Sequence, residues 1–109
     1  MGYDVWMGNN RGSKYSRENS EYPEGDDATN PEQYAEKYDI SFKDMGTVDV
    51  PAFLDKITEV TGHEKMSYIG YSNGNVQMTY ALMMMEESYF VDKLDRVVYQ
   101  APGIFPQPI

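Results

Sequence analysis

Residues 66–74, with the sequence MSYIGYSNG, decide the fold of this chain. The run from Met66 to Tyr71 is short and apolar, as expected for a buried strand, and it stops at a Gly-x-Ser-x-Gly pattern at positions 70–74. A second apolar segment with helical character follows from Asn75 to Glu87. We therefore expect a strand, a tight turn and a helix in direct succession.

A first helix is predicted upstream of this strand. Asp49 is a plausible N-cap, Pro51 falls in the first turn, and Gly62 lies just past the end. Between them, apolar residues recur at helical spacing and predict an amphipathic helix of about three turns. These residues are Val50, Phe53, Leu54, Ile57 and Val60.

Two further strands complete the expected order. Tyr3 to Met7 is rich in aromatic and β-branched residues and runs into turn formers at 8–12, and Arg96 to Gln100 has a similar composition before the break at 101–103. Strands that alternate with helices imply right-handed crossovers and a parallel sheet. The sequence therefore predicts an α/β fold with parallel strands and crossover helices.

The predicted helix from Asn75 to Glu87 has apolar side chains around most of its axis, so we expect it to be largely buried. Its run Met83-Met84-Met85 could also offer soft metal ligands or an adaptable lipid contact. Core packing explains the run more simply, and we expect that role.

Ser72 is the candidate nucleophile. A serine at the tip of a strand-turn-helix sits in a strained backbone conformation, and small residues two positions on either side, here Gly70 and Gly74, relieve the crowding. The helix N-terminus favours developing negative charge, so the backbone N–H of Asn73 is a candidate oxyanion donor. The alternative is a strand-to-helix turn that uses its glycines for tight packing alone.

Composition and charge exclude several classes of partner. The 109 residues contain 18 acidic and 9 basic side chains, a net charge of -9 that repels phosphate backbones, so nucleic acid is not expected to bind. The longest apolar run, Ala81 to Met85, is far shorter than the roughly 20 residues of a membrane helix. No signal peptide is recognisable at Met1 to Trp6. The chain has no cysteine, which leaves the compartment open.

Five stretches of the chain resemble the acid lipase family, which includes lysosomal acid lipase and gastric lipase. They are GYDVWMGNNRG at 2–12, YSR at 15–17, SFKDMG at 41–46 with DVPA at 49–52, the turn at 70–74, and Ala101-Pro102. The resemblance implies hydrolysis of ester bonds in neutral lipids, such as acylglycerols or sterol esters. It implies a Ser-His-Asp triad with Ser72 as nucleophile, and no metal or organic cofactor.

Some features depart from that family. It usually has His and Gln where this chain has Tyr71 and Asn73, which changes the side chains that meet the substrate. It also takes its second oxyanion donor from a loop upstream of Tyr3, and its Asp and His from beyond Ile109. The strand equivalent to residues 66–71 pairs in the family with a strand that precedes Tyr3.

From these departures we expect residues 1–109 to form a partial α/β-hydrolase domain with a polar surface excursion at 13–39. The chain lacks the triad Asp and His and is expected to be inactive alone, with the remainder of the hydrolase domain as its partner. For a full-length chain, the resemblance implies a lysosomal or secreted location.

Other polar residues have simpler explanations. His63 is the single histidine, but a strand that rises about 3.3 Å per residue separates it from Ser72, so we expect a surface residue. Arg11 could steer a substrate, although an ion pair with one of the many carboxylates is the simpler role. Solvated charges explain the pairs Asp26-Asp27 and Glu86-Glu87 better than metal ligands do.

Three hypotheses about function follow. The first is a carboxylic ester hydrolase, specifically a lipase. The second is a noncatalytic α/β-hydrolase fragment that acts as an interaction module. The third is an acyl transferase or thioesterase on the same fold.

Overall fold

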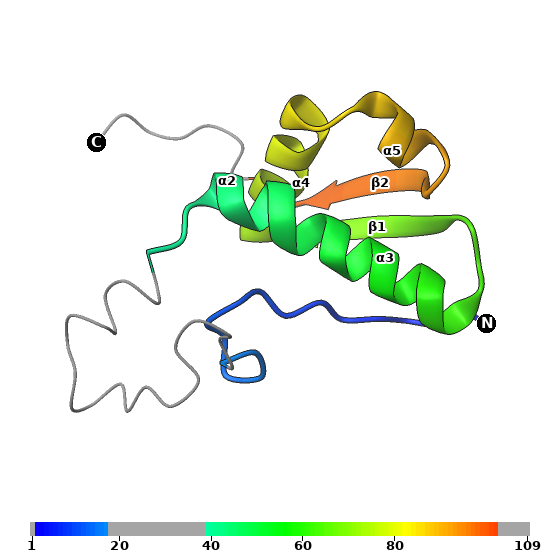
Figure 1. The fold of residues 1–109 in the computed structure, drawn as a ribbon, viewed down its shortest axis with the longest axis horizontal. Helices are drawn as coiled ribbons and strands as arrows, with labels where there is room; N and C mark the ends of the chain where they lie inside the picture. Colours follow the sequence, from blue (N-terminus) through cyan, green and yellow to red (C-terminus); the bar gives the residue numbers. More distant parts are fainter. Residues whose placement is uncertain (1, 18–38, 103–109) are drawn as a thin grey trace. The chain divides into compact units, whose positions relative to one another are not determined.

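The computed structural model describes residues 2–17 and 39–102 (Figure 1). They divide into two units, one up to residue 41 and one from residue 42 onward. The second unit contains every helix and strand assigned among the described residues, in the order α2, η1, α3, β1, α4, α5, β2. It therefore holds the elements on which the site is built.

The predicted strand from Tyr3 to Met7 is not formed. Residues 2–10 have neither helical nor strand structure, and Tyr3 and Met7 are almost fully exposed. A strand needs a neighbour to complete its backbone hydrogen bonds, and the sheet in the described part of the chain contains no strand from this segment. A turn follows, in which the N–H of Gly12 donates to the carbonyl of Ser16 at 2.8 Å. Most of the predicted excursion at 13–39 lies outside the described residues.

One continuous helical segment precedes the sheet. It consists of α2 (Phe42–Asp44), the π-helical turn η1 (Met45–Asp49) and α3 (Val50–Thr61). α3 begins directly after Asp49, as predicted, but the Asp49 side chain forms no capping hydrogen bond, and its backbone is already helical, with φ -72° and ψ -43°. The predicted end is confirmed, since Gly62 adopts φ 71° and donates its N–H to the carbonyl of Thr58.

The sheet in the described part of the chain consists of the parallel strands β1 (Met66–Tyr71) and β2 (Leu94–Gln100). The extent of β1 is confirmed at both ends, and β2 begins two residues before the predicted strand. Met66 pairs with Leu94 and the next residue of β1 pairs with Arg96, so Asp95 is an extra residue in β2, a β-bulge.

The helices pack on one face of this sheet. α4 (Asn73–Met84) follows β1 directly, and the short helix α5 (Glu87–Val91), which the sequence did not predict, leads into β2. The buried apolar core joins α3, α4 and α5 and consists of Val50, Leu54, Met78, Ala81 and Phe90. Gly46 lets η1 approach α4 closely, because a Cβ there would lie 2.5 Å from the carbonyl oxygen of Gln77.

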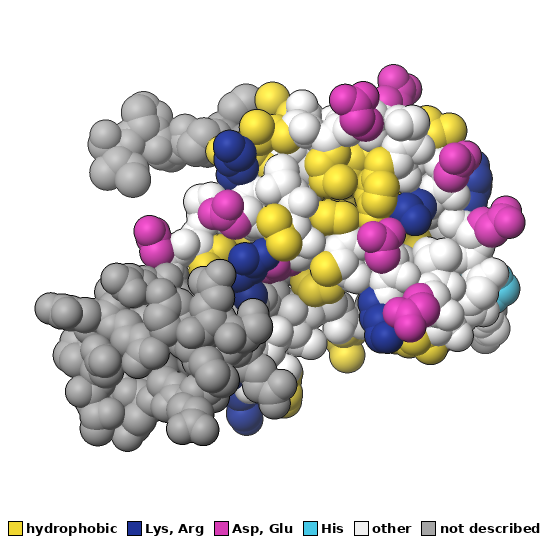
Figure 2. Space-filling view, viewed as in Figure 1, with side chains coloured by type: hydrophobic (Ala, Val, Ile, Leu, Met, Phe, Trp, Pro, Cys, Tyr) yellow, Lys and Arg dark blue, Asp and Glu magenta, His cyan; other side chains and the backbone are white. Residues whose placement is uncertain are grey.

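Much apolar surface outside this core is exposed, contrary to two predictions. Met83 of α4 is 78% exposed and Ile69 of β1 is 65% exposed, so neither the helix nor the strand is buried on all sides. The expected core role of Met83 and Met84 is wrong for the described chain, whereas Met85 packs against the core. A helix or strand that is apolar on all sides needs packing partners on all sides. In the described part of the chain, α4 and β1 have such partners on one side only. Figure 2 shows hydrophobic side chains exposed among carboxylates on the face that carries α4 and α5.

Candidate active site

Ser72 lies at the tip of the turn between β1 and α4. Its backbone has φ 50° and ψ -112°, a conformation that an L-residue with a side chain rarely adopts. Such a residue costs on the order of 1–3 kcal/mol and persists only where its surroundings enforce it. The side chain is exposed, so its hydroxyl is accessible to a substrate.

Backbone hydrogen bonds connect this turn to the end of β2. The N–H of Ser72 donates to the carbonyl of Gln100 at 3.2 Å, and the carbonyl of Ser72 accepts from the N–H of Asn75 at 3.0 Å. Both backbone polar groups of the strained residue are therefore engaged. These bonds make the strained conformation the one that satisfies the local polar groups.

The two glycines of the turn differ in what they accommodate. A Cβ at Gly70 would lie 2.6 Å from Oδ1 of Asn75 and 3.0 Å from its backbone nitrogen, which is too close for any side chain. A Cβ at Gly74 would meet the Tyr68 hydroxyl at 3.6 Å, an ordinary van der Waals distance. Gly70 therefore relieves crowding as expected, whereas the described residues around Gly74 leave room for a Cβ.

Asn73, the candidate oxyanion donor, is exposed and is the first residue of α4. The first N–H groups of a helix have no acceptor within the helix, and the helix dipole favours negative charge at this end. The backbone N–H of Asn73 therefore lies at the start of α4, next to Ser72 in the chain.

Tyr68 and Asn75 support the turn, and sequence reasoning missed both. The Tyr68 hydroxyl donates to the carbonyl of Gly74 at 2.8 Å, and the side-chain amide of Asn75 donates to the carbonyl of Gln100 at 2.7 Å. Burial raises the pKa of Tyr68, against the opposing effect of a hydrogen bond with Gln77, so the hydroxyl stays neutral. No local signal could have identified Asn75, because its partner lies 25 residues away in sequence.

The other candidate residues do not join Ser72. His63 is exposed just beyond Gly62, and the whole of β1 separates it from the turn at Ser72, which confirms its predicted place on the surface. Arg11 lies in the first unit, so its predicted roles stay predictions.

The acidic pairs lie away from the turn as well. Glu86 and Glu87 are exposed at the start of α5, and Asp26-Asp27 falls outside the described residues. Within 2–17 and 39–102, no group of three His, Asp or Glu side chains could hold a metal ion.

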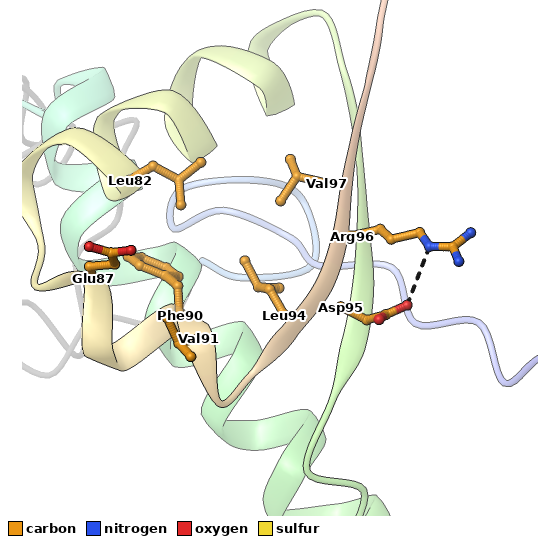
Figure 3. Close-up of a pocket in the computed structure, with 8 residues that line it drawn as sticks. All are labelled: Leu82, Glu87, Phe90, Val91, Leu94, Asp95, Arg96 and Val97. Atoms are coloured by element: carbon orange, nitrogen blue, oxygen red, sulfur yellow. Dashed lines mark ion pairs between the residues drawn. The ribbon is translucent and has the colours of Figure 1, made fainter.

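An open groove of about 370 Å³ lies near the amino end of β2, far along the strand from Ser72 (Figure 3). Leu94 and Val97 point from β2 toward the helices, whereas Asp95 and Arg96 point away from them and form an ion pair at 3.5 Å. The groove is lined by Leu82, Glu87, Phe90, Val91, Leu94, Asp95, Arg96 and Val97. It is not part of the Ser72 site.

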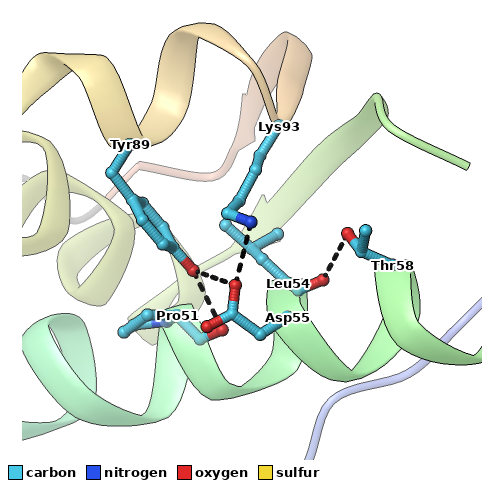
Figure 4. Close-up of polar contacts among 6 residues, drawn as sticks. All are labelled: Pro51, Leu54, Asp55, Thr58, Tyr89 and Lys93. Atoms are coloured by element: carbon cyan, nitrogen blue, oxygen red, sulfur yellow. Dashed lines mark hydrogen bonds and ion pairs between the residues drawn. The ribbon is translucent and has the colours of Figure 1, made fainter.

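A cluster of polar side chains joins α3 to α5 near the amino ends of the strands (Figure 4). The Tyr89 hydroxyl lies 2.7 Å from Oδ1 of Asp55 and 3.1 Å from the carbonyl of Pro51, and Nζ of Lys93 lies 3.1 Å from Oδ1 of Asp55. Partial burial would raise the pKa of Asp55, but hydrogen bonds from Tyr89 and Lys93 outweigh it and lower that pKa. Burial and the adjacent carboxylate raise the pKa of Tyr89 well above its usual range. This cluster is a structural contact between neutral Tyr89 and charged Asp55.

None of the described helices combines the length and the apolar character that crossing a membrane requires. Comparison with known proteins shows what the chain is similar to. It matches the family model described as the alpha/beta hydrolase fold over residues 1–108. No solved structure matches it.

Within this family, the chain is similar to curated lipases and a sterol esterase. The chain is 39% identical to a probable lipase of Schizosaccharomyces pombe over 97% of its own length and 22% of the relative's. It is 42% identical to gastric triacylglycerol lipase of Mus musculus over 67% of the chain and 16% of the relative. It is 30% identical to sterol esterase 2 of Saccharomyces cerevisiae over 99% of the chain and 20% of the relative.

The chain thus spans about a fifth of the length of the curated relatives it matches. Its similarity to gastric lipases confirms the resemblance predicted from its sequence motifs. The parallel strands and crossover helices agree with the fold of the matching family. This chain therefore belongs to the alpha/beta hydrolase fold family, in which the relatives it matches include lipases and a sterol esterase.

Proposed function

We propose that residues 1–109 carry the nucleophile of a carboxylic ester hydrolase, a lipase that acts on neutral lipid esters such as acylglycerols or sterol esters. The observation that carries this proposal is the exposed Ser72 at φ 50° between a parallel strand and a helix N-terminus. The names of the lipase and sterol esterase relatives support the choice of lipid esters.

In this proposal, Oγ of Ser72 attacks the ester carbonyl carbon while a base accepts the hydroxyl proton. The carbonyl oxygen becomes an oxyanion, which the backbone N–H of Asn73 stabilises. Collapse of this intermediate expels the alcohol, which takes the proton from the base, and water then releases the fatty acid by the same steps in reverse.

We propose further that the base, its carboxylate partner and a second oxyanion donor come from segments outside residues 1–109. The single histidine supports this arrangement. His63 is separated from the turn by six strand residues, a span of roughly 20 Å that exceeds hydrogen-bond reach several times over.

Active-site labelling tests the nucleophile. In the protein expressed with the coding sequence that flanks this stretch, a fluorophosphonate probe is expected to modify Ser72, as located by mass spectrometry. Ser72→Ala should abolish the labelling. Ser67→Ala is the matched control, because Ser67 is an exposed serine of β1 outside the turn.

An adduct on Ser67 or Ser88 would reject the assignment of Ser72. A well-folded protein that reacts with neither the probe nor any lipid ester would instead favour the noncatalytic interaction module.

A further inference from the structure

Asn75 stands out because it is completely buried beside the nucleophile turn. Its exposed fraction is 0%, and its Nδ2 donates to the carbonyl of Gln100 at 2.7 Å. Oδ1 of Asn75 faces Gly70 and has no hydrogen-bond partner among the described residues. The orientation of the amide follows from chemistry, since a carbonyl oxygen accepts hydrogen bonds and only the nitrogen of the amide can donate one.

The carbonyl of Gln100 also accepts the hydrogen bond from the N–H of Ser72. A single oxygen atom at the end of β2 therefore anchors both the strained serine and the buried amide. Asn75 also contacts the serine directly, because its own N–H donates to the carbonyl of Ser72 at 3.0 Å. Residue 75 is thus connected to Ser72 by its backbone directly and by its side chain through Gln100.

Gly70 makes this arrangement possible. A Cβ at position 70 would lie 2.6 Å from Oδ1 of Asn75, so the space that a side chain would fill is occupied by the amide. The absence of a side chain at Gly70 and the burial of Asn75 are therefore two parts of one packing arrangement.

We propose that Asn75 is a positioning residue that fixes the backbone of Ser72, and with it the direction of the attacking hydroxyl. The inference rests on the proposed function. A strained residue relaxes unless its neighbours prevent it, and the Asn75 amide holds the shared Gln100 anchor against the turn. Asn75 itself is not expected to touch the substrate.

This role predicts that catalysis and stability separate in Asn75→Ala. The variant loses one hydrogen bond, but it also loses a buried oxygen without a partner, and Ala is the better helix former. We therefore expect the unfolding transition to change little. In contrast, kcat toward a nitrophenyl ester should fall by at least about tenfold with KM within about twofold, because a misdirected nucleophile slows the chemical step and leaves binding intact.

Two further variants make the test specific. Asn75→Asp keeps the shape, but its carboxyl can donate to Gln100 only when it is protonated. Relative to wild type at the same pH, it should therefore be slow at high pH and recover as pH falls if donation to Gln100 matters. Thr79→Val is the matched control one turn along α4. Its hydroxyl bonds to the carbonyl of Asn75 at 2.8 Å and to the hydroxyl of Tyr99 at 3.0 Å, and not to Gln100. It should lower stability and leave kcat unchanged.

The experiment measures kcat, KM, the rate of fluorophosphonate labelling and thermal unfolding for these variants and Ser72→Ala in the protein with its flanking segments. A wild-type kcat in Asn75→Ala, or a kcat in Thr79→Val as low as in Asn75→Ala, would overturn the positioning role. Activity that survives in Ser72→Ala would overturn the proposed function instead, so the two failures are distinguishable.

Discussion

The two ends of the β1–β2 pair are built in different ways. At the carboxyl ends, the carbonyl of Gln100 accepts hydrogen bonds from the Ser72 backbone and from the amide of Asn75, which is fully buried. At the amino ends, the cluster of Asp55, Tyr89 and Lys93 lies at the surface, and the Asp55 side chain is 57% exposed.

The difference shows where this fold demands exact geometry. At the carboxyl ends, the Asn75 amide is fully buried, so water cannot reach it to replace its hydrogen bond to the carbonyl of Gln100. The exposed cluster can exchange its partners for water at little cost. Substitutions at the carboxyl ends should therefore have larger effects than substitutions at the amino ends.

The largest effect is expected from the lack of a histidine within reach of Ser72 in residues 1–109. Residues 1–109 alone should show no specific esterase activity, since losing the general base of a triad costs on the order of a million-fold in turnover. The measurement compares wild type, Ser72→Ala and His63→Ala, purified identically, on a short-chain nitrophenyl ester. If both substitutions removed a real activity, His63 would have to reach Ser72, and the separation of the two strand ends would be wrong.

A smaller effect distinguishes the two glycines of the turn. Gly70→Ala forces a Cβ against Oδ1 of Asn75, so it should destabilise the protein by about 1–3 kcal/mol. Gly74→Ala meets only ordinary contacts, so it should be neutral or should stabilise the first turn of α4 by up to about 1 kcal/mol. Chemical denaturation of the two variants checks this order, and equal losses would contradict it.

The smallest effect is expected at Asp55. Its folded pKa lies below the ordinary value of 3.8, so its charge stabilises the fold above that pH, and the contribution disappears as pH falls through the lowered pKa. Asp55→Asn should therefore cost less than about 1 kcal/mol near neutral pH, given the exposure of the side chain. The difference from wild type should shrink below about pH 4.

Glu59→Gln is the control for this variant, because Glu59 pairs with Lys56 at 2.9 Å within a single helix and both side chains are more exposed. Denaturation curves across pH should show a smaller effect for Glu59→Gln than for Asp55→Asn. A larger effect would mean that the cluster with Tyr89 adds nothing to a simple surface pair.

Local patterns predicted much of the fold. The extent of β1 and the end of α3 at Gly62 follow from an apolar run and a glycine that can adopt positive φ. The start of α3 at Val50 also follows from Asp49 and Pro51, but no pattern predicted that residues 42–49 already form helical turns before it. The five residues of α5 are too few to show a period.

The site was only partly predictable, because some of its features depend on segments distant in the sequence. The place of Ser72 depends on adjacent residues, so the pattern at 70–74 identified the turn. The burial of Asn75 depends on the end of β2, and the exposure of Met83 depends on what surrounds a helix that is apolar on every side. Contacts between distant segments leave no signal in a single sequence.

The bulge in β2 bears on how sequences of this family can change in length. Leu94 and Val97 both face the helices although three positions separate them, because Asp95 interrupts the alternation of the strand. A relative without Asp95 would keep both side chains on the helix side and gain a regular strand. A deletion within β1, by contrast, would turn every following side chain to the opposite face and displace Ser72. Insertions and deletions should therefore accumulate between Leu94 and Val97 and be absent between Met66 and Ser72.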